Sequence, residues 1–168
     1  MILVRGLKIN QLSFQWAVVL LLISALVSGC ASRKAKLRAR QTEAVIQTAR
    51  SYIGTPYKYG GTTRSGMDCS GLLINSYRAI NITLPRESES QATMGEKIKL
   101  KEVKPGDLVF FATGKKRRQI THVGMVTEVR GKDNVKFIHA SSSLGVIETN
   151  LYSDYFLKKF RLARRIID

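Results

Sequence analysis

Three residues in this sequence have side chains and surroundings suited to nucleophilic chemistry: Cys69, His122 and His139. Cys69 lies where a glycine-rich stretch gives way to a helical pattern, so we expect it in the first turn of a helix. A thiol there feels the positive end of the helix dipole and backbone N–H groups that have no partner within the helix. Both favour the thiolate, the nucleophilic form of cysteine. The alternative is a small buried thiol that only packs against its neighbours.

The helix that must position Cys69 is predicted to run to about Ile80. Asp68, directly before it, is a suitable N-cap, and apolar residues at helical spacing give the helix a buried face. These apolar residues are Leu72, Leu73, Tyr77 and Ile80. The preceding stretch, residues 56–66, is rich in turn-forming residues and predicts a loop.

Both histidines fall on predicted strands, at 120–129 and 135–140, joined by a turn at 131–134. If these strands pair, alternation of side chains can place His122 and His139 close together on one face of the sheet. His122 would accept the thiol proton, and His139 would hold the other ring nitrogen and fix the tautomer. Gly124, beside the base, would keep the approach open for a substrate. A Cys/His₂ zinc site is the competing interpretation, which the wide spacing of the three ligands disfavours.

The remaining elements predict an α+β domain in which N-terminal helices pack on an antiparallel sheet. A helix from residue 42 is expected to end at Gly54-Thr55-Pro56, and its apolar face consists of Val45, Ile46, Ala49 and Ile53. Further strands are predicted at 108–112, 146–149 and 160–166, and short helical turns at 87–95 and 153–158.

Residues 1–29 have the pattern of an export signal, with basic residues first, an apolar run at 16–27, and small residues last. The run is short for a membrane-spanning helix, which needs about 20 apolar residues. The sequence Leu26-Val27-Ser28-Gly29-Cys30 resembles the bacterial lipoprotein box, in which the cysteine is lipidated and becomes the mature N-terminus. An ordinary signal peptide with a chance cysteine is the alternative. Lipidation of Cys30 would leave Cys69 without a disulfide partner in an exported protein, which a nucleophilic role explains economically.

The next segment, residues 30–41, is predicted to be a lipidated basic tether, disordered and lying against headgroups, with a solvated helix as the alternative. The folded domain is then expected at 42–168. Removal of Arg5 and Lys8 with the leader leaves 26 basic residues against 12 acidic ones, a net charge of +14. This charge predicts an anionic partner, although it can also serve solubility alone. Export argues against nucleic acid and favours lipid headgroups or acidic cell-wall polymers.

Six short motifs occur in the order found in the NlpC-type cell-wall cysteine peptidases. They are Pro56-Tyr57-Lys58-Tyr59-Gly60-Gly61, Asp68-Cys69-Ser70-Gly71, Leu84-Pro85-Arg86, Pro105-Gly106-Asp107-Leu108, His122-Val123-Gly124 and Phe137-Ile138-His139-Ala140-Ser141-Ser142. The chain resembles this family over residues 42–166. Its leader and its ending Ala163-Arg164-Arg165 make it look closest to the murein DD-endopeptidase lipoproteins of Gram-negative bacteria.

This resemblance implies a papain-like NlpC-type fold and hydrolysis of peptidoglycan stem peptides without a metal or cofactor. It implies that Cys69 is the nucleophile, His122 the base and His139 the third member of a triad. It also implies that Tyr57 helps to stabilise the oxyanion, a role shared with backbone N–H groups at the helix start. Packing in a loop is the alternative for Tyr57.

Two further residues match motif positions of the family. Ser70 would serve helix capping and the geometry of the oxyanion hole. Arg86 would meet a stem-peptide carboxylate or would simply be a solvated charge. A basic insert before the first histidine belongs to none of the motifs, and it consists of Lys115, Lys116, Arg117 and Arg118.

The leading hypothesis is a murein endopeptidase that cleaves D-Ala–diaminopimelate cross-links through a thioester on Cys69. Cleavage of the γ-D-glutamyl–diaminopimelate bond and a non-catalytic murein-binding lipoprotein are the alternatives. Cys30 is followed by Ala31 rather than aspartate, which by the rule for Gram-negative lipoproteins predicts the outer membrane, facing the periplasm. The expected partners are stem peptides and, through Cys30, the membrane; a monomer is expected.

Overall fold

The computed structural model describes the backbone of residues 11–167 and the side chains of Trp16 and of residues 32–167. By its internal contacts the chain divides into residues 1–37 and residues 38–168. The helix α1 (Gln11–Arg50) has residues in both units, and every other element belongs to the second. No helix in the described part of the chain is both long and apolar enough to cross a membrane.

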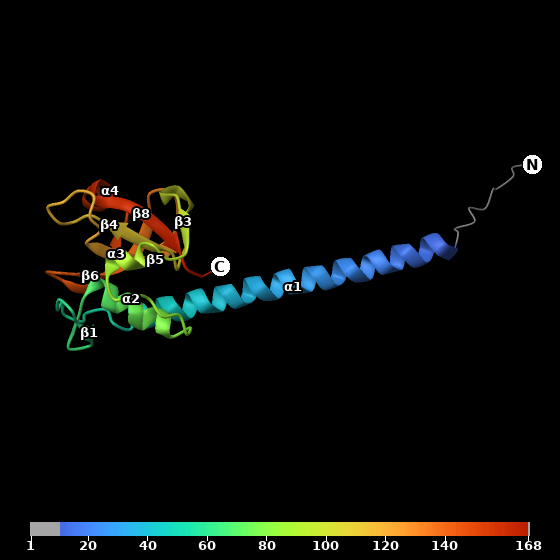
Figure 1. The fold of residues 1–168 in the computed structure, drawn as a ribbon, viewed down its shortest axis with the longest axis horizontal. Coiled ribbons are helices and arrows are strands. Elements are labelled where there is room, and N and C mark those ends of the chain that lie inside the picture. The colour runs from blue at the N-terminus through green and yellow to red at the C-terminus, as the bar shows by residue number, and fades with distance from the viewer. Residues whose placement is uncertain (1–10, 168) are drawn as a thin grey trace, which may run out of the picture. The chain divides into compact units, whose positions relative to one another are not determined.

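A six-stranded antiparallel sheet forms the centre of the second unit (Figure 1). Along the chain its strands are β3 (Glu96–Ile98), β4 (Leu108–Phe111), β5 (His122–Val129), β6 (Val135–Ser141), β7 (Gly145–Asn150) and β8 (Phe160–Arg165). Their order in the sheet is β3-β8-β4-β5-β6-β7, so β4 to β7 form consecutive hairpins and β8 returns to pair with β4 and β3.

Short elements surround the sheet. These are the hairpin β1 (Thr62–Thr63) and β2 (Gly66–Met67), the helices α2 (Cys69–Arg78), α3 (Ser88–Gln91) and α4 (Asp154–Lys159), and the 3₁₀ helix η1 (Leu100–Glu102). Helix α2 packs against β5 and β6. Its buried face places the first residue, Cys69, against one end of the sheet.

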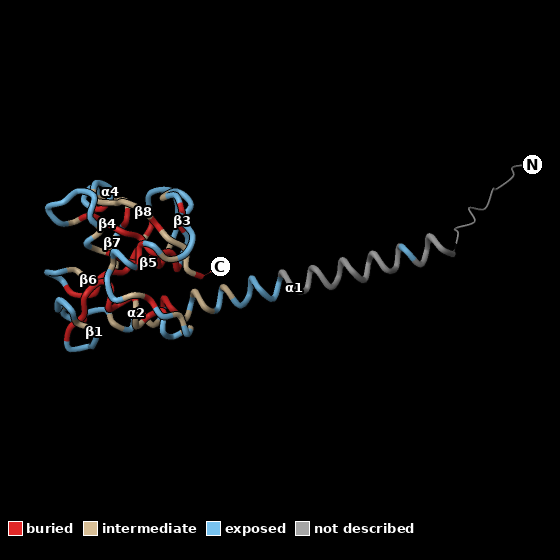
Figure 2. Tube along the Cα trace, viewed as in Figure 1, coloured by how far each residue is buried: buried red, intermediate tan, exposed pale blue. Residues whose placement is uncertain are grey.

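Both faces of the sheet are covered, because the side chains of β4 alternate between two apolar clusters. Leu108 and Phe110 pack with α2 and the last turns of α1, whereas Val109 and Phe111 pack with Phe156 of α4. Figure 2 shows that the buried residues concentrate in the strands and in α2. The histidine strands therefore lie between two packed layers.

The predicted strands at 108–112, 120–129, 135–140, 146–149 and 160–166 correspond to β4, β5, β6, β7 and β8. The sequence did not reveal β3 or the hairpin β1–β2, because strands of two or three residues carry too few side chains for an alternating pattern. Helix α2 ends at Arg78 and α1 at Arg50, somewhat earlier than predicted. Ile53 was expected on a buried helical face, but it follows the helix and is 52% exposed.

The basic segment at 32–40 is helical and forms part of α1. The prediction of a disordered tether is therefore wrong, and the alternative, a solvated helix, describes the structure. The segment is rich in Ala, Leu, Lys and Arg, which are good helix formers, and it contains no Gly or Pro. It continues into the packed turns that contain Val45, Ile46 and Ala49, so the buried end of the helix supports it.

Candidate active site

The start of α2 is fixed by its N-cap, as the sequence predicts. Asp68 has an extended backbone, and its Oδ1 accepts a hydrogen bond of 2.8 Å from the N–H of Gly71. Its Oδ2 accepts a second bond of 2.9 Å from the N–H of Gly60. A Cβ atom on Gly71 would meet the carbonyl oxygen of Gly61 at 2.4 Å, so only glycine allows this approach of loop and helix. Together these contacts fix the backbone position of Cys69, which lies between Asp68 and Ser70.

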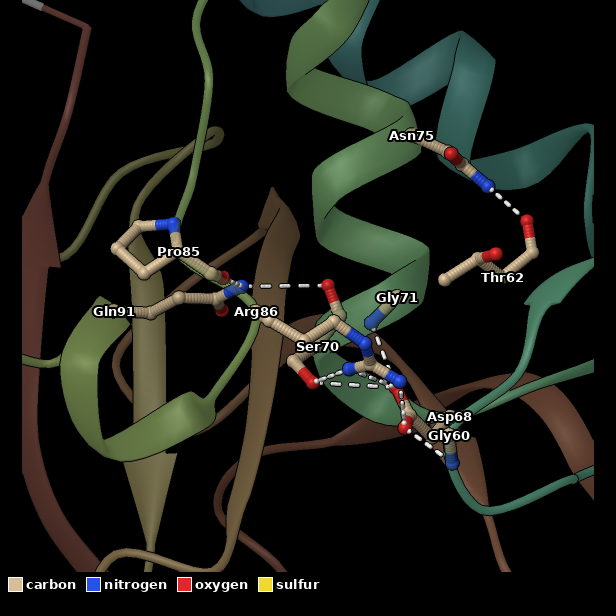
Figure 3. A network of polar contacts seen from close by, with 9 residues as sticks. All are labelled: Gly60, Thr62, Asp68, Ser70, Gly71, Asn75, Pro85, Arg86 and Gln91. Atoms are coloured by element: carbon tan, nitrogen blue, oxygen red, sulfur yellow. Dashed lines mark hydrogen bonds and ion pairs between the residues drawn. The ribbon is translucent and has the colours of Figure 1, made fainter.

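Arg86 completes a charged network around this cap (Figure 3). Its Nη1 and Nη2 donate to the two carboxylate oxygens of Asp68 at 3.0 and 2.5 Å, and Nη1 also donates to Ser70 Oγ at 2.7 Å. Burial alone would raise the pKa of Asp68, but the hydrogen bonds from Arg86 and from the Gly71 N–H outweigh it and lower that pKa. Arg86 is therefore paired within the site rather than a freely solvated charge, and Ser70 is tied to the same network.

Gln91 connects this network to the loop that carries Arg86. Its Nε2 donates to the carbonyl oxygen of Pro85 at 2.8 Å and to that of Ser70 at 3.3 Å (Figure 3). The Gln91 side chain is fully buried. Nothing in the sequence singled out Gln91, because its two partners lie 6 and 21 residues away.

The Cys69 thiol is a free cysteine, and it is buried with 8% of the residue exposed. Burial raises its pKa, the Asp68 carboxylate raises it further, and a hydrogen bond from the Val123 backbone N–H only partly opposes them. As predicted, the first-turn N–H groups of Cys69 and Ser70 lower this pKa, but removal of the charged form from water outweighs them, so the thiol is neutral at rest. The sulfur lies beside the backbone of Val123, the residue after His122.

The two histidines are hydrogen-bonded to each other, with 3.0 Å between His122 Nε2 and His139 Nδ1. His139 Nε2 lies 3.2 Å from Thr149 Oγ1 on the neighbouring strand β7. When His139 accepts at Nδ1, its proton resides on Nε2 and is donated to Thr149. This arrangement leaves Nδ1 of His122 as the nitrogen available to a thiol proton. Thr149 was missed by sequence reasoning because only strand pairing brings it to His139.

The histidines share one face of the sheet, as predicted, but this is not the face on which α2 packs. Aromatic side chains surround them, and the Phe137 ring stacks on His139 with 4.8 Å between ring centroids. Phe156 meets His139 edge-on at 5.2 Å. Burial lowers the pKa of His122 to about 4 and, together with the neighbouring His122, that of His139 to about 3. Both rings are therefore neutral near pH 7.

Cys69 and His122 thus come from opposite faces and meet at the end of the sheet where α2 and β5 begin. Within the described residues they form no direct hydrogen bond, a separation common in ligand-free catalytic sites. Gly124 does not open an approach for substrate, since it is buried and a Cβ there would meet the Phe137 ring at 2.5 Å. Its role is to let Phe137 lie under β5 and stack on His139.

Two cavities flank the site. One of about 450 Å³ contains Cys69 and is also lined by Tyr57, Tyr59, Gly60, Asp68, Ser70, Arg86, Glu87, Ser88, Glu89, Gln119, Ile120 and Thr121. The other, of about 300 Å³, contains both histidines and is also lined by Tyr57, Thr113, Thr121, Ala140, Ser141, Ser142, Tyr155 and Phe156. Tyr57 and Thr121 line both, so the two cavities adjoin at these residues.

Tyr57 lines both cavities and lies near enough to Cys69 for the two groups to affect each other's charge. Burial raises the pKa of Tyr57, and the adjacent Cys69 and Asp68 raise it further, so the phenol stays protonated and can donate. In the part of the chain that the structure describes, no three histidine, cysteine or acidic side chains are grouped as metal ligands. Cys30, the predicted lipidation site, lies outside the described side chains.

An α+β domain with a cysteine at a helix start and paired histidines on adjoining strands is the arrangement of a papain-like cysteine peptidase. The family described as "NlpC/P60 family" matches residues 54–165, and the chain belongs to this family. The predicted family, fold class and cysteine peptidase activity are thereby confirmed.

Curated relatives include the "Probable endopeptidase NlpC" of Escherichia coli K12, 40% identical over 156 residues, which cover 88% of this chain and 97% of that protein. The E. coli K12 "Murein DD-endopeptidase MepS/Murein LD-carboxypeptidase" is 36% identical over 68% of this chain and 57% of its own length. The "Gamma-DL-glutamyl hydrolase" of Bacillus subtilis is 41% identical over 72% of this chain but only 28% of its own length.

Among solved structures, an NlpC/P60 family protein from Bacillus cereus ATCC 10987 superposes with a TM-score of 0.67 at 29% identity. The alignment covers 76% of this chain and 40% of that one.

Proposed function

We propose that this protein is a peptidoglycan endopeptidase of the cell envelope that cleaves D-Ala–diaminopimelate cross-links between stem peptides. Family membership and the similarity to a murein DD-endopeptidase support peptidoglycan as the substrate. The observation that carries the catalytic proposal is the hydrogen-bonded line from His122 through His139 to Thr149, which begins beside the Cys69 thiol. This line gives a neutral base a fixed orientation.

In the proposed reaction the scissile amide lies across the boundary of the two cavities. Since the resting thiol and imidazole are both neutral, His122 Nδ1 takes the thiol proton as the sulfur attacks the carbonyl carbon. The imidazolium is stabilised by donating Nε2–H to His139 Nδ1. Collapse of the tetrahedral intermediate breaks the C–N bond, and His122 returns the proton to the leaving amine. Water then hydrolyses the Cys69 thioester by the same base.

Oxyanion stabilisation is assigned to the start of α2 and to Tyr57. The first-turn N–H groups of Cys69 and Ser70 lie close enough to the thiol to lower its pKa, so they can donate to an oxyanion formed there, and the Tyr57 hydroxyl can add a donor. Asp68, Ser70 and Arg86 hold this turn in place through their network. Because Arg86 is already paired with Asp68, its substrate contact would be a weak electrostatic attraction to a carboxylate.

The second candidate function is hydrolysis of the γ-D-glutamyl–diaminopimelate bond. The similarity to a γ-DL-glutamyl hydrolase favours it, and the same nucleophile and base would carry it out. Both functions predict a Cys69-dependent hydrolase, so they differ only in the products.

Digestion of purified murein followed by mass spectrometry of the released fragments separates these alternatives. We expect cross-linked dimers to be converted to monomers with intact stem peptides. Truncated stems that begin at diaminopimelate would instead establish the γ-D-glutamyl cleavage. Cys69→Ser should bind murein and release nothing, because the hydroxyl is a far weaker nucleophile in the same place. Equal release by wild type and Cys69→Ser would refute the thiol mechanism.

We also propose that residues 1–29 are a lipoprotein leader, that Cys30 is lipidated, and that residues 30–41 connect it to the peptidase domain at 42–168. The sequence Leu26-Val27-Ser28-Gly29-Cys30 supports this proposal. Several acyl chains anchor firmly where one holds only marginally, and basic residues add attraction to anionic headgroups. Cys30→Ala behind a cleavable signal should release a soluble periplasmic enzyme. Unchanged fractionation with the outer membrane would contradict the anchor.

A further inference from the structure

Four consecutive cations project from the loop between β4 and β5, and none of the roles above uses them. We call Lys115, Lys116, Arg117 and Arg118 the basic loop. All four residues are exposed. Among the described residues, none of the four forms an ion pair, whereas Arg50, Arg86, Arg130 and Arg165 all do. The charge of the basic loop is therefore not neutralised by the surrounding protein.

The basic loop is held in place rather than merely solvated. At its base, Thr121 Oγ1 accepts hydrogen bonds from the N–H groups of Thr113 at 2.9 Å and Gly114 at 3.2 Å. At its tip, Arg161 Nε donates to the carbonyl oxygen of Arg117. Arg161 also donates to the carbonyl oxygens of Lys158, in α4, and of Phe160, which directly follows α4, so the loop lies near the end of that helix (Figure 1). Arg161 and Lys158 add two further positive charges beside it.

The basic loop is continuous with the walls of both cavities. Its C-terminal neighbours Gln119, Ile120 and Thr121 line the Cys69 cavity. Thr113 and Thr121, at its two ends, line the histidine cavity. The Cys69 cavity is also lined by two acidic residues: Glu87, which directly precedes α3, and Glu89, which lies in α3. The mouth of the site therefore has acidic side chains as well as the adjacent cations.

We propose that the basic loop binds free carboxylates of the same murein strand whose amide occupies the cavities, and so directs the cross-linked polymer into the site. This inference rests on the proposed function. Murein stem peptides carry free carboxylates next to their cross-links, and a cationic rim raises the rate of encounter with such a polyanion. We favour murein over lipid headgroups because the residues on both sides of the loop line the cavities, where a substrate must pass.

The test compares two variants with the same loss of charge. The loop variant combines Lys115→Gln, Lys116→Gln, Arg117→Gln and Arg118→Gln, which leaves the backbone carbonyl that Arg161 contacts. The control variant combines Lys97→Gln, Lys99→Gln, Lys101→Gln and Lys104→Gln, four exposed residues that line neither cavity of the site. Each is assayed on intact murein and on murein whose carboxylates have been amidated, at low salt and at about 1 M salt, where the Debye length is about 3 Å.

At low salt we expect kcat/KM on intact murein to fall about tenfold in the loop variant and less than about twofold in the control. The difference between wild type and loop variant should disappear at high salt and on amidated murein. Equal rates for wild type and loop variant at low salt would overturn the proposal. So would equal losses in both variants, which would make net charge the cause.

A binding measurement separates this proposal from the proposed function. Cys69→Ser, with and without the loop substitutions, is sedimented with intact murein and with vesicles of anionic phospholipid. Loop-dependent binding to murein supports the inference even if no hydrolysis is found, and such a result would count against the proposed reaction alone. Loop-dependent binding to vesicles and not to murein would overturn the inference and assign the loop to the membrane.

Discussion

The two sides of the Cys69 thiol differ in how they hold their polar groups. On the α2 side, Asp68 and Arg86 are charged, and each carboxylate oxygen accepts two or more hydrogen bonds. On the strand side, His122 and His139 are neutral, and each lies next to at least one phenyl ring. The charged side fixes the backbone of the nucleophile, whereas the neutral side keeps a base ready to take a proton.

This difference has a chemical consequence. A cation next to a buried carboxylate stays charged through the reaction, so the Asp68–Arg86 pair can only position. A buried neutral imidazole can gain a proton when the thiol loses one, because the thiolate and imidazolium appear together as a pair of opposite charges. Substitutions on the charged side should therefore act on the rate only through the position of Cys69, whereas substitutions of the histidines should lower the rate directly.

Among substitutions on the two sides of the thiol, the largest effect is expected from His122→Ala, which removes the proton acceptor. General-base catalysis contributes about 10²- to 10⁴-fold, so kcat on murein should fall by that range. His139→Gln should cost less, because the amide can still accept from His122 Nε2. Steady-state rates of both variants, with circular dichroism as a check of folding, measure the difference. If His139→Gln were the more damaging substitution, the two histidines would have to exchange roles.

On the charged side, Asp68→Asn should mainly reduce stability. The amide still accepts from the Gly71 N–H, but Arg86 loses its partner next to a buried cap. Asp68 is nearly buried and Arg86 is 42% exposed on its side chain, so we expect a loss of about 1–3 kcal/mol in the free energy of unfolding.

Urea denaturation measures this loss, and Glu128→Gln is a matched control. The Arg130–Glu128 pair is exposed, with 63% and 29% of the two side chains accessible, and its loss should cost less than about 1 kcal/mol. Equal losses in Asp68→Asn and Glu128→Gln would mean that the cap network does not stabilise the helix start.

On the neutral side, the two histidines should make the folding stability depend on pH. The pKa of His122 is lowered to about 4 and that of His139 to about 3 by burial, below the value of a free histidine. Between about pH 6.5 and those values the unfolded chain binds protons that the folded protein does not, so stability rises with pH there and is lost as the pH falls. His139→Gln should reduce this loss in thermal denaturation measured from pH 7 to pH 4. An unchanged pH dependence would show that His139 is not held neutral by the fold.

Sequence reasoning was most successful where the physics is local. The N-cap role of Asp68 follows from its place directly before the helix. The shared face of His122 and His139 follows from the alternation of side chains along two strands joined by a short turn. It failed where burial decides: the thiol of Cys69 has a raised pKa because strands distant in sequence enclose it. The Asp68–Arg86 pair and the contact of His139 with Thr149 depend on loops and pairings that no local pattern encodes.

The smallest expected effect tests the outer end of the neutral side. Thr149→Val keeps the shape of the side chain but removes the oxygen that accepts from His139 Nε2. A buried donor without a partner costs about 1–3 kcal/mol, so the tautomer with the proton on Nδ1 becomes more favourable. In that tautomer His139 donates to His122 Nε2, which forces the His122 proton onto Nδ1, the nitrogen that must accept from Cys69. We therefore expect kcat to fall about tenfold with KM unchanged.

Thr149→Ser provides the control, because it restores the hydroxyl and should return kcat close to the wild-type value. The ¹⁵N chemical shifts of the two imidazoles report the tautomers directly, and only Thr149→Val should shift the proton of His139 from Nε2 to Nδ1. A merely structural role of Thr149 would lower stability without moving that proton. If Thr149→Val kept the wild-type kcat and the wild-type tautomers, Thr149 would have no part in catalysis. The orientation of the base would then depend on the stacking of Phe137 against His139.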